Sequence, residues 1–198
     1  MRTIFSILLI LSVLFQGCKG QAKTAPKEIF NKEFNWRIEI PQGFESVDAE
    51  QWMKMQSRGT DAIEKTYDAK VENNAKTIFV FRSDQFNYFE SNYQPFDTAS
   101  DGNYVESFRA VNNLLFGTFE AQIPNAKLDS SSSQEFIDGK LFQTFKVTIT
   151  IPNKIRMEYL MYSRLFGTKE FTVNIMTVNK EKQKVLLNAW RNSKFAKE

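Results

Sequence analysis

The second half of the chain is a series of alternating apolar and polar residues interrupted by turn signals, and this pattern limits the fold more than any other feature. The runs between the turns are rich in β-branched and aromatic side chains. Such runs, joined by short turns, form antiparallel strands with one apolar face. The sequence therefore predicts four antiparallel strands after Ala126. The turn signals that separate them are Asp138-Gly139, Pro152-Asn153 and Gly167-Thr168.

The first half of the chain adds further strands and the helices. Residues 34–40 alternate between apolar and polar side chains and stop at Pro41, which is typical of a half-buried strand. Residues 77–82 and 86–93 predict two more strands. Helices are predicted after three capping residues, Asp48, Asn103 and Asn179. The fold class expected from this order is α+β, with an antiparallel β-sheet of about six to seven strands and helices packed on it.

Composition sets limits on function. The chain has 198 residues, 42% of them hydrophobic, which fits one folded domain. It contains no histidine, and this excludes Ser-His-Asp and Cys-His nucleophilic sites and zinc centres with histidine ligands. The formal net charge of +3 is small, so we expect no nucleic-acid partner. No Walker loop, G-x-G-x-x-G or C-x-x-C motif occurs, and the sequence predicts no cofactor and no metal site.

The first residues have the layout of a secretory signal peptide, with a positive charge at Arg2 before an apolar run that ends at Phe15. This run is shorter than the roughly 20 apolar residues that cross a bilayer. The segment Leu14-Phe15-Gln16-Gly17-Cys18 resembles a bacterial lipobox, in which the cysteine carries diacylglycerol and becomes the first mature residue. Acylation of Cys18 would also consume the chain's single thiol, a liability in an oxidising compartment. An ordinary cleavage after Ala22 is the alternative.

This interpretation divides the chain into three parts. They are a signal peptide over residues 1–17, a lipidated cysteine with a flexible tether over 18–33, and a single α+β domain over 34–198. The lipid would hold the protein on a membrane without spanning it. Because Lys19 and not an aspartate follows the cysteine, the resemblance to lipoproteins implies the outer membrane of a Gram-negative bacterium.

Three segments of the predicted domain carry a resemblance to a known family. They are the strand and turn at residues 36–44, the turn Asp138-Gly139-Lys140, and the closing helix from Trp190 to Phe195. Together they resemble the PsbP-type α/β/α sandwich of many small bacterial lipoproteins. The resemblance covers residues 34–196 and implies an accessory or docking protein. It implies no catalytic residue.

An aromatic segment is the candidate binding surface. On a strand, Phe86 and Tyr88 point to one face while Phe89 and Tyr93 point to the other, so one set stays exposed. Exposed rings stack on sugars or anchor peptides, which makes an envelope protein or a glycan the candidate partner besides the membrane. The alternative is that these rings pack in the core. The predicted surface consists of Phe86, Tyr88, Phe89, Tyr93 and Phe96.

The remaining polar segments predict no catalytic residue. Residues 97–103 have the composition of a calcium loop, but Ala99 and Phe108 occupy ligand positions, so a turn before Asn103 is expected. The run Ser130–Ser133 predicts a solvated loop at a strand margin. The main hypothesis is a non-catalytic, lipid-anchored envelope protein that binds a partner. The alternatives are a carrier with an apolar ligand between a helix and the sheet, and a carboxylate-dependent hydrolase.

Overall fold

A computed structural model describes residues 27–68, 70, 74–152 and 155–196 of the chain. The predicted leader, Cys18 and residues 19–26 of the predicted tether lie outside the described residues. Within these described ranges, no helix is both long enough and apolar enough to cross a membrane.

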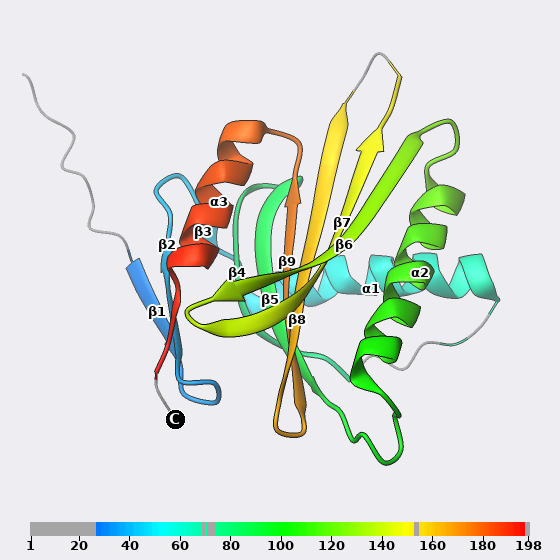
Figure 1. The fold of residues 1–198 in the computed structure, drawn as a ribbon. Helices are drawn as coiled ribbons and strands as arrows, with labels where there is room; N and C mark the ends of the chain where they lie inside the picture. Colours follow the sequence, from blue (N-terminus) through cyan, green and yellow to red (C-terminus); the bar gives the residue numbers. More distant parts are fainter. Residues whose placement is uncertain (1–26, 69, 71–73, 153–154, 197–198) are drawn as a thin grey trace, which may run out of the picture.

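The centre of the molecule is a seven-stranded sheet in the order β3-β4-β5-β9-β8-β7-β6 (Figure 1). All neighbouring strands in it are antiparallel, which confirms the predicted class. The four strands predicted after Ala126 are β6 to β9. The strands are β3 (Glu45–Ser46), β4 (Lys76–Asp84), β5 (Asn87–Pro95), β6 (Lys127–Ile137), β7 (Lys140–Thr150), β8 (Arg156–Phe166) and β9 (Lys169–Thr177).

A small sheet and one helix cover the first face of the large sheet. The small sheet has the order β1-β2-β10, with β1 (Lys27–Asn31), β2 (Trp36–Ile40) and β10 (Lys194–Phe195). The helix is α3 (Lys180–Asn192). Trp36 of β2 and Trp190 of α3 are both 0% exposed and meet with ring centroids 6.0 Å apart. They pack on Phe89 and Phe171 of the large sheet, so aromatic side chains fill this half of the core.

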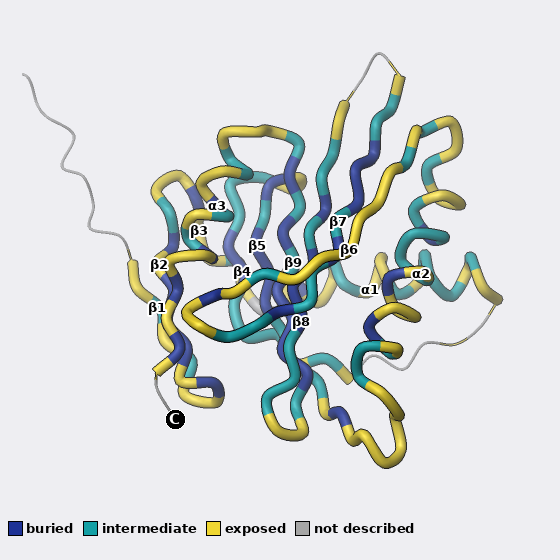
Figure 2. Tube along the Cα trace, viewed as in Figure 1, coloured by how far each residue is buried: buried dark blue, intermediate teal, exposed yellow. Residues whose placement is uncertain are grey.

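Helices α1 (Ala49–Tyr67) and α2 (Tyr104–Gln122) cover the opposite face. Phe108 and Phe119 of α2 pack against a second apolar cluster on β7 and β8. The hydroxyl of Tyr67 in α1 donates to the carbonyl of Leu114 in α2 at 3.0 Å, which joins the two helices. Burial is concentrated on the central strands, whereas β6 is exposed along most of its length (Figure 2).

Each helix begins at the capping residue that the sequence predicts. The Oδ1 atoms of Asp48, Asn103 and Asn179 accept backbone N–H groups of the first turn at 2.8–2.9 Å. These caps pair donors that have no partner inside the helix. Helix α1 then continues through Gly59 without a break.

The structure corrects three expectations. Residues 27–31 lie in β1, paired with β2, and not in the predicted tether. Ser130–Ser133 lie within β6, because pairing with β7 overrides their preference for loops. Phe195, expected at the end of the closing helix, is 4% exposed in β10 and joins the core.

Candidate functional site

The five aromatic residues predicted as a binding surface do not share one face. Phe86 lies in the turn between β4 and β5 and is 42% exposed. Phe89 is fully buried and stacks on Phe81, with ring centroids 4.6 Å apart. Phe96 is also buried, and its ring packs edge to face on Tyr104 of α2 at 5.7 Å.

The other two rings of this set are half-buried. Tyr88 packs against Trp52 of α1 with centroids 5.2 Å apart, and Tyr93 packs against Phe34 at 5.4 Å. As strand parity predicts, Tyr88 and Phe89 point to opposite faces of the sheet. Both faces of β5 are covered, however, so neither ring is free. Core packing, the alternative interpretation, describes four of the five rings.

The face of the sheet under α1 and α2 contains a buried polar cluster around Glu90 of β5. Glu90 is 2% exposed, and its carboxylate accepts Asn174 Nδ2 at 2.5 Å and Asn92 Nδ2 at 2.8 Å. Asn174 Oδ1 in turn accepts the hydroxyl of Tyr159 at 2.7 Å. Burial raises the pKa of Glu90 to about 7, against the opposing effect of the two amide donors. A carboxyl that titrates near neutral pH is a candidate acid or base, so its access to substrate decides its role.

A second carboxylate, Glu170 of β9, lies on the same face and is 8% exposed. It accepts Ser163 Oγ at 2.8 Å and Gln94 Nε2 at 2.7 Å, and Ser163 Oγ accepts the Tyr104 hydroxyl at 2.7 Å. Glu90 lies opposite Asn174 in the β5–β9 register. Asn174 is four residues from Glu170 along β9, so Glu90 and Glu170 are separated by about 13 Å in the strand direction.

The two carboxylates do not form the acid–base pair that a glycosidase needs. Such pairs face each other across an open cleft at roughly 5–10 Å. Glu90 and Glu170 each have their own amide or hydroxyl donors, and neither lines any of the five main cavities of the described surface. Their hydrogen bonds stabilise the interior. Within the described ranges there is also no group of three acidic or cysteine side chains that could hold a metal ion.

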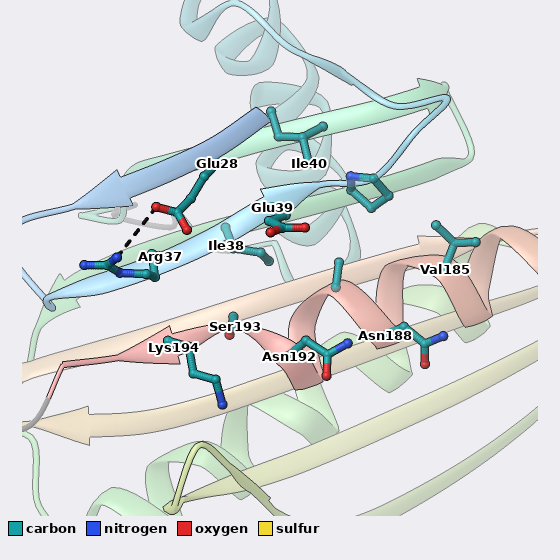
Figure 3. A pocket seen from close by; sticks show the side chains of 12 residues that line it. Glu28, Arg37, Ile38, Glu39, Ile40, Val185, Asn188, Asn192, Ser193 and Lys194 are labelled. Carbon is teal, nitrogen blue, oxygen red and sulfur yellow. Dashed lines mark ion pairs between the residues drawn. The ribbon is translucent and has the colours of Figure 1, made fainter. Parts of the chain in front are cut away.

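A groove with a volume of about 360 Å³ separates β2 from α3 (Figure 3). Its lining combines apolar residues, Ile38 and Ile40 of β2 and Ala189 of α3, with the exposed amides of Asn188 and Asn192. Apolar surface beside exposed amides can accept a chain that presents both apolar and polar groups.

Two ion pairs lie beside the walls of this groove. Arg37 of β2 pairs with Glu28 of β1 at 3.7 Å, the contact drawn in Figure 3. Lys194 of β10 pairs with Asp138 in the β6–β7 turn at 3.0 Å, and Asp138 also accepts the backbone N–H of Phe195. Both ion pairs are partly exposed, so each contributes little to stability. Only the contacts of Asp138 act on β10, which they hold beside β2.

The edge of β2 is open inside the groove. Strand β10 pairs only with Trp36 and Arg37 of β2, and the carbonyl of Asn35 accepts the N–H of Ala196. Backbone groups alternate in direction along an antiparallel strand. The backbone groups of Glu39 therefore point to the same side as those of Asn35, at a position beyond Lys194, where β10 begins. Among the described residues, the N–H and C=O of Glu39 have no ladder partner on that side.

Ser193 adds a second unpaired group to this groove. It ends α3, lines the groove and is 3% exposed, and its Oγ has no hydrogen-bond partner in the described part of the chain. A buried hydroxyl without a partner costs free energy that a ligand could recover.

A larger open depression of about 1060 Å³ lies beside β3 and β4. Its acidic side chains already have roles in the fold, since Asp48 caps α1 and Asp84 pairs with Lys182 at 2.7 Å. This pairing, with the Asn87 amide, holds the pKa of the Asp84 carboxyl well below its usual range although burial opposes the shift. The groove between β2 and α3 is therefore the better candidate site.

Sequence reasoning missed the groove, although α3 carried a signal for it. The sequence predicts one apolar stripe on this helix. In the structure Leu186 and Trp190 fill the core, whereas Val185 and Ala189 line the groove. The apolar stripe of α3 is wider than the part of the helix that packs in the core, and this excess width was the signal in the sequence.

No protein-family model matches this sequence, and no curated protein matches it. Among solved structures, the cyanobacterial PsbP (CyanoP) of Synechocystis sp. PCC 6803 matches with a TM-score of 0.56 at 11% identity, covering 91% of this chain and 99% of that chain. The Ran-binding protein Mog1p of Saccharomyces cerevisiae matches with a TM-score of 0.42 at 9% identity, covering 86% and 95%. The match to PsbP confirms the predicted PsbP-like α+β fold, and at this identity it shows the fold alone.

Proposed function

We propose that this chain is a lipid-anchored envelope protein that acts without catalysis, as an accessory module that binds an extended segment of another envelope protein. The groove between β2 and α3 is the proposed binding site. The observation that supports this function best is the open edge of β2, where Glu39 presents an N–H and a C=O that have no ladder partner in the described part of the chain. Unpaired strand edges bind extended polypeptide by adding a strand, because main-chain hydrogen bonds then form along the edge.

The anchor in this proposal is Cys18. The eight residues from Lys19 to Pro26 can reach at most about 28 Å between the lipid and β1. The groove would then stay close to the membrane surface, where it meets other envelope proteins. Two or more acyl chains hold a protein on a bilayer durably, whereas one chain binds only marginally.

Labelling with an alkyne fatty acid tests the anchor. Wild type is expected to incorporate the label and to sediment with membranes, and Cys18→Ser is expected to lose both properties because it has no thiol to acylate. The measurement is in-gel fluorescence of the labelled band together with membrane fractionation. A wild-type protein that stays unlabelled and soluble would favour the cleavage after Ala22 and would remove the anchor from the proposal.

Site-specific photocross-linking in intact cells tests the groove. A photoreactive amino acid replaces Asn188, which borders the groove on α3, and in a matched control it replaces Asn113, which is exposed on α2. We expect one defined adduct with an envelope protein from position 188. The purified protein is also extracted with organic solvent for mass spectrometry, and a stoichiometric lipid there would support the apolar-ligand carrier instead.

A further inference from the structure

Strand β6 forms an unprotected edge of the large sheet. It is the last strand in the order, and among the described residues no strand pairs with its outer side. Its ladder with β7 is continuous over residues 127–137, without a bulge. No proline interrupts it, and Asp129 to Gln134 are all exposed. Soluble proteins normally block such edges with proline, bulges, inward charges or a covering segment.

The turn at the end of β6 shows which backbone groups are free. Asp138 and Gly139 have φ values of 47° and 76°, the combination of a type I′ hairpin turn. Ile137 and Lys140, which flank this turn, are therefore a hydrogen-bonded pair. By alternation the odd-numbered residues of β6 bond to β7, and the even-numbered ones point their N–H and C=O outward. The outward-facing residues are Leu128, Ser130, Ser132, Gln134 and Phe136.

We propose that β6 pairs with β6 of a second copy of this chain, antiparallel about a two-fold axis at Ser131. This pairing continues the large sheet from one protomer into the other. The interface is isologous, because each protomer contributes the same residues. The proposal goes beyond the proposed function, since it does not use the groove.

The charged side chains of β6 favour the register with the axis at Ser131 over the register with the axis at Ser132. With the axis at Ser131, Lys127 lies opposite Glu135 of the partner subunit, and the same pair forms twice. With the axis at Ser132, which also aligns outward-facing backbone groups, Asp129 would lie opposite the partner's Glu135. Opposite charges directly across a strand pair stabilise it, and like charges destabilise it. The axis at Ser131 is therefore favoured.

The side chain of Glu135 is held in place by two groups of its own protomer. Arg191 of α3 donates to its carboxylate at 2.7 Å through Nε, and the Tyr162 hydroxyl donates at 3.1 Å. Because these bonds fix the side chain, less conformational entropy is lost when the partner's Lys127 approaches.

An exposed aromatic ring on the same strand supports the pairing independently. Phe136 is 69% exposed, the highest value among the exposed large hydrophobic residues in the described part of the chain. In the proposed register it lies opposite the partner's Ala126 and diagonal to the partner's Leu128. Both are apolar, so pairing removes the ring from water, which is favourable.

Disulfide trapping of the full chain in intact cells tests the proposal. At Ser131 the two copies face each other as a non-hydrogen-bonded pair, where Cα atoms lie about 4.5 Å apart, within the range of a disulfide. The matched control is Ser133→Cys, on the same exposed strand and the same face, whose counterpart on the partner lies about 13 Å away. Wild type, with its single cysteine at Cys18, gives the background.

We expect Ser131→Cys to form a covalent homodimer with mild oxidant, several-fold above Ser133→Cys and wild type. Adding Lys127→Glu should reduce that yield several-fold, because glutamates then face each other. Equal yields from positions 131 and 133, an adduct with a different protein, or a yield insensitive to Lys127→Glu would each overturn the proposal. Thermal unfolding of each variant, expected to match wild type, excludes loss of folding as the cause.

Discussion

Replacing Trp190 with alanine is expected to lower the free energy of unfolding by about 3–5 kcal/mol. The side chain is 0% exposed and lies where α3, the small sheet and the large sheet meet. Its ring contacts those of Phe142 at 5.1 Å and Tyr162 at 5.6 Å. Removing it leaves a cavity that these rigid rings cannot fill, and the lost contacts join both sheets. Urea unfolding followed by circular dichroism measures the effect.

Two further variants serve as controls. Trp190→Phe keeps an aromatic ring in place, and no hydrogen bond is lost because Trp190 Nε1 has no partner in the described structure. We expect its cost to be well below that of alanine. Val185→Ala removes a side chain from the same helix at a position that is 38% exposed, and should cost less than about 1 kcal/mol. A Trp190→Ala cost no larger than that of Val185→Ala would contradict the packing of α3 on the sheet.

Glu90→Gln is expected to change how stability depends on pH. Burial raises the pKa of Glu90 from 4.5 to about 7 in the folded protein. Between these values the unfolded chain releases its proton while the folded one keeps it, so the free energy of unfolding falls as pH rises and levels off above pH 7. The loss is at most about 3 kcal/mol. The glutamine variant has no such proton, so its stability relative to wild type should rise by up to this amount over the same window.

Unfolding measurements at several pH values between about 4 and 8 check this result. Glu120→Gln, at an exposed position on α2, is the control, and its stability should change with pH in parallel with wild type.

Glu158 affects stability in a different pH window, because the hydrogen bonds of Lys146 and Gln183 overcome its burial and lower its pKa to about 2. Its contribution is present above pH 4.5 and is lost as pH falls below that value. A constant difference between Glu90→Gln and wild type would contradict the assigned environment of Glu90.

The helices and long strands could be predicted because their signals are local. Asp48, Asn103 and Asn179 cap helices through bonds to their own first turns, and strand parity in β7 and β8 follows from alternation within each strand. The two-residue strand β10 has no such signal. It exists because Asp138, far away in the sequence, holds Lys194 and Phe195 against β2.

The candidate site could not be predicted because it also depends on contacts between residues that are far apart in the sequence. Parity showed that Tyr88 and Phe89 point to opposite faces, but whether a face is exposed depends on what covers it, and Trp52 of α1 covers Tyr88. The groove depends on where β10 stops along β2, which is set by tertiary contacts. The serines of β6 favour turns locally and are held in a strand by β7.

The central claim is that the open edge of β2 binds a partner, and the most direct test combines cross-linking from position 188 with a proline at Glu39. Because the backbone groups of Glu39 point into the groove and away from β1, Glu39→Pro removes the free N–H without breaking the β1–β2 ladder. Glu39→Ala keeps the N–H and controls for loss of the carboxylate. We expect the envelope-protein adduct from position 188 to persist in Glu39→Ala and to disappear in Glu39→Pro. An adduct of equal yield in both variants, or none above that from position 113, would contradict the claim.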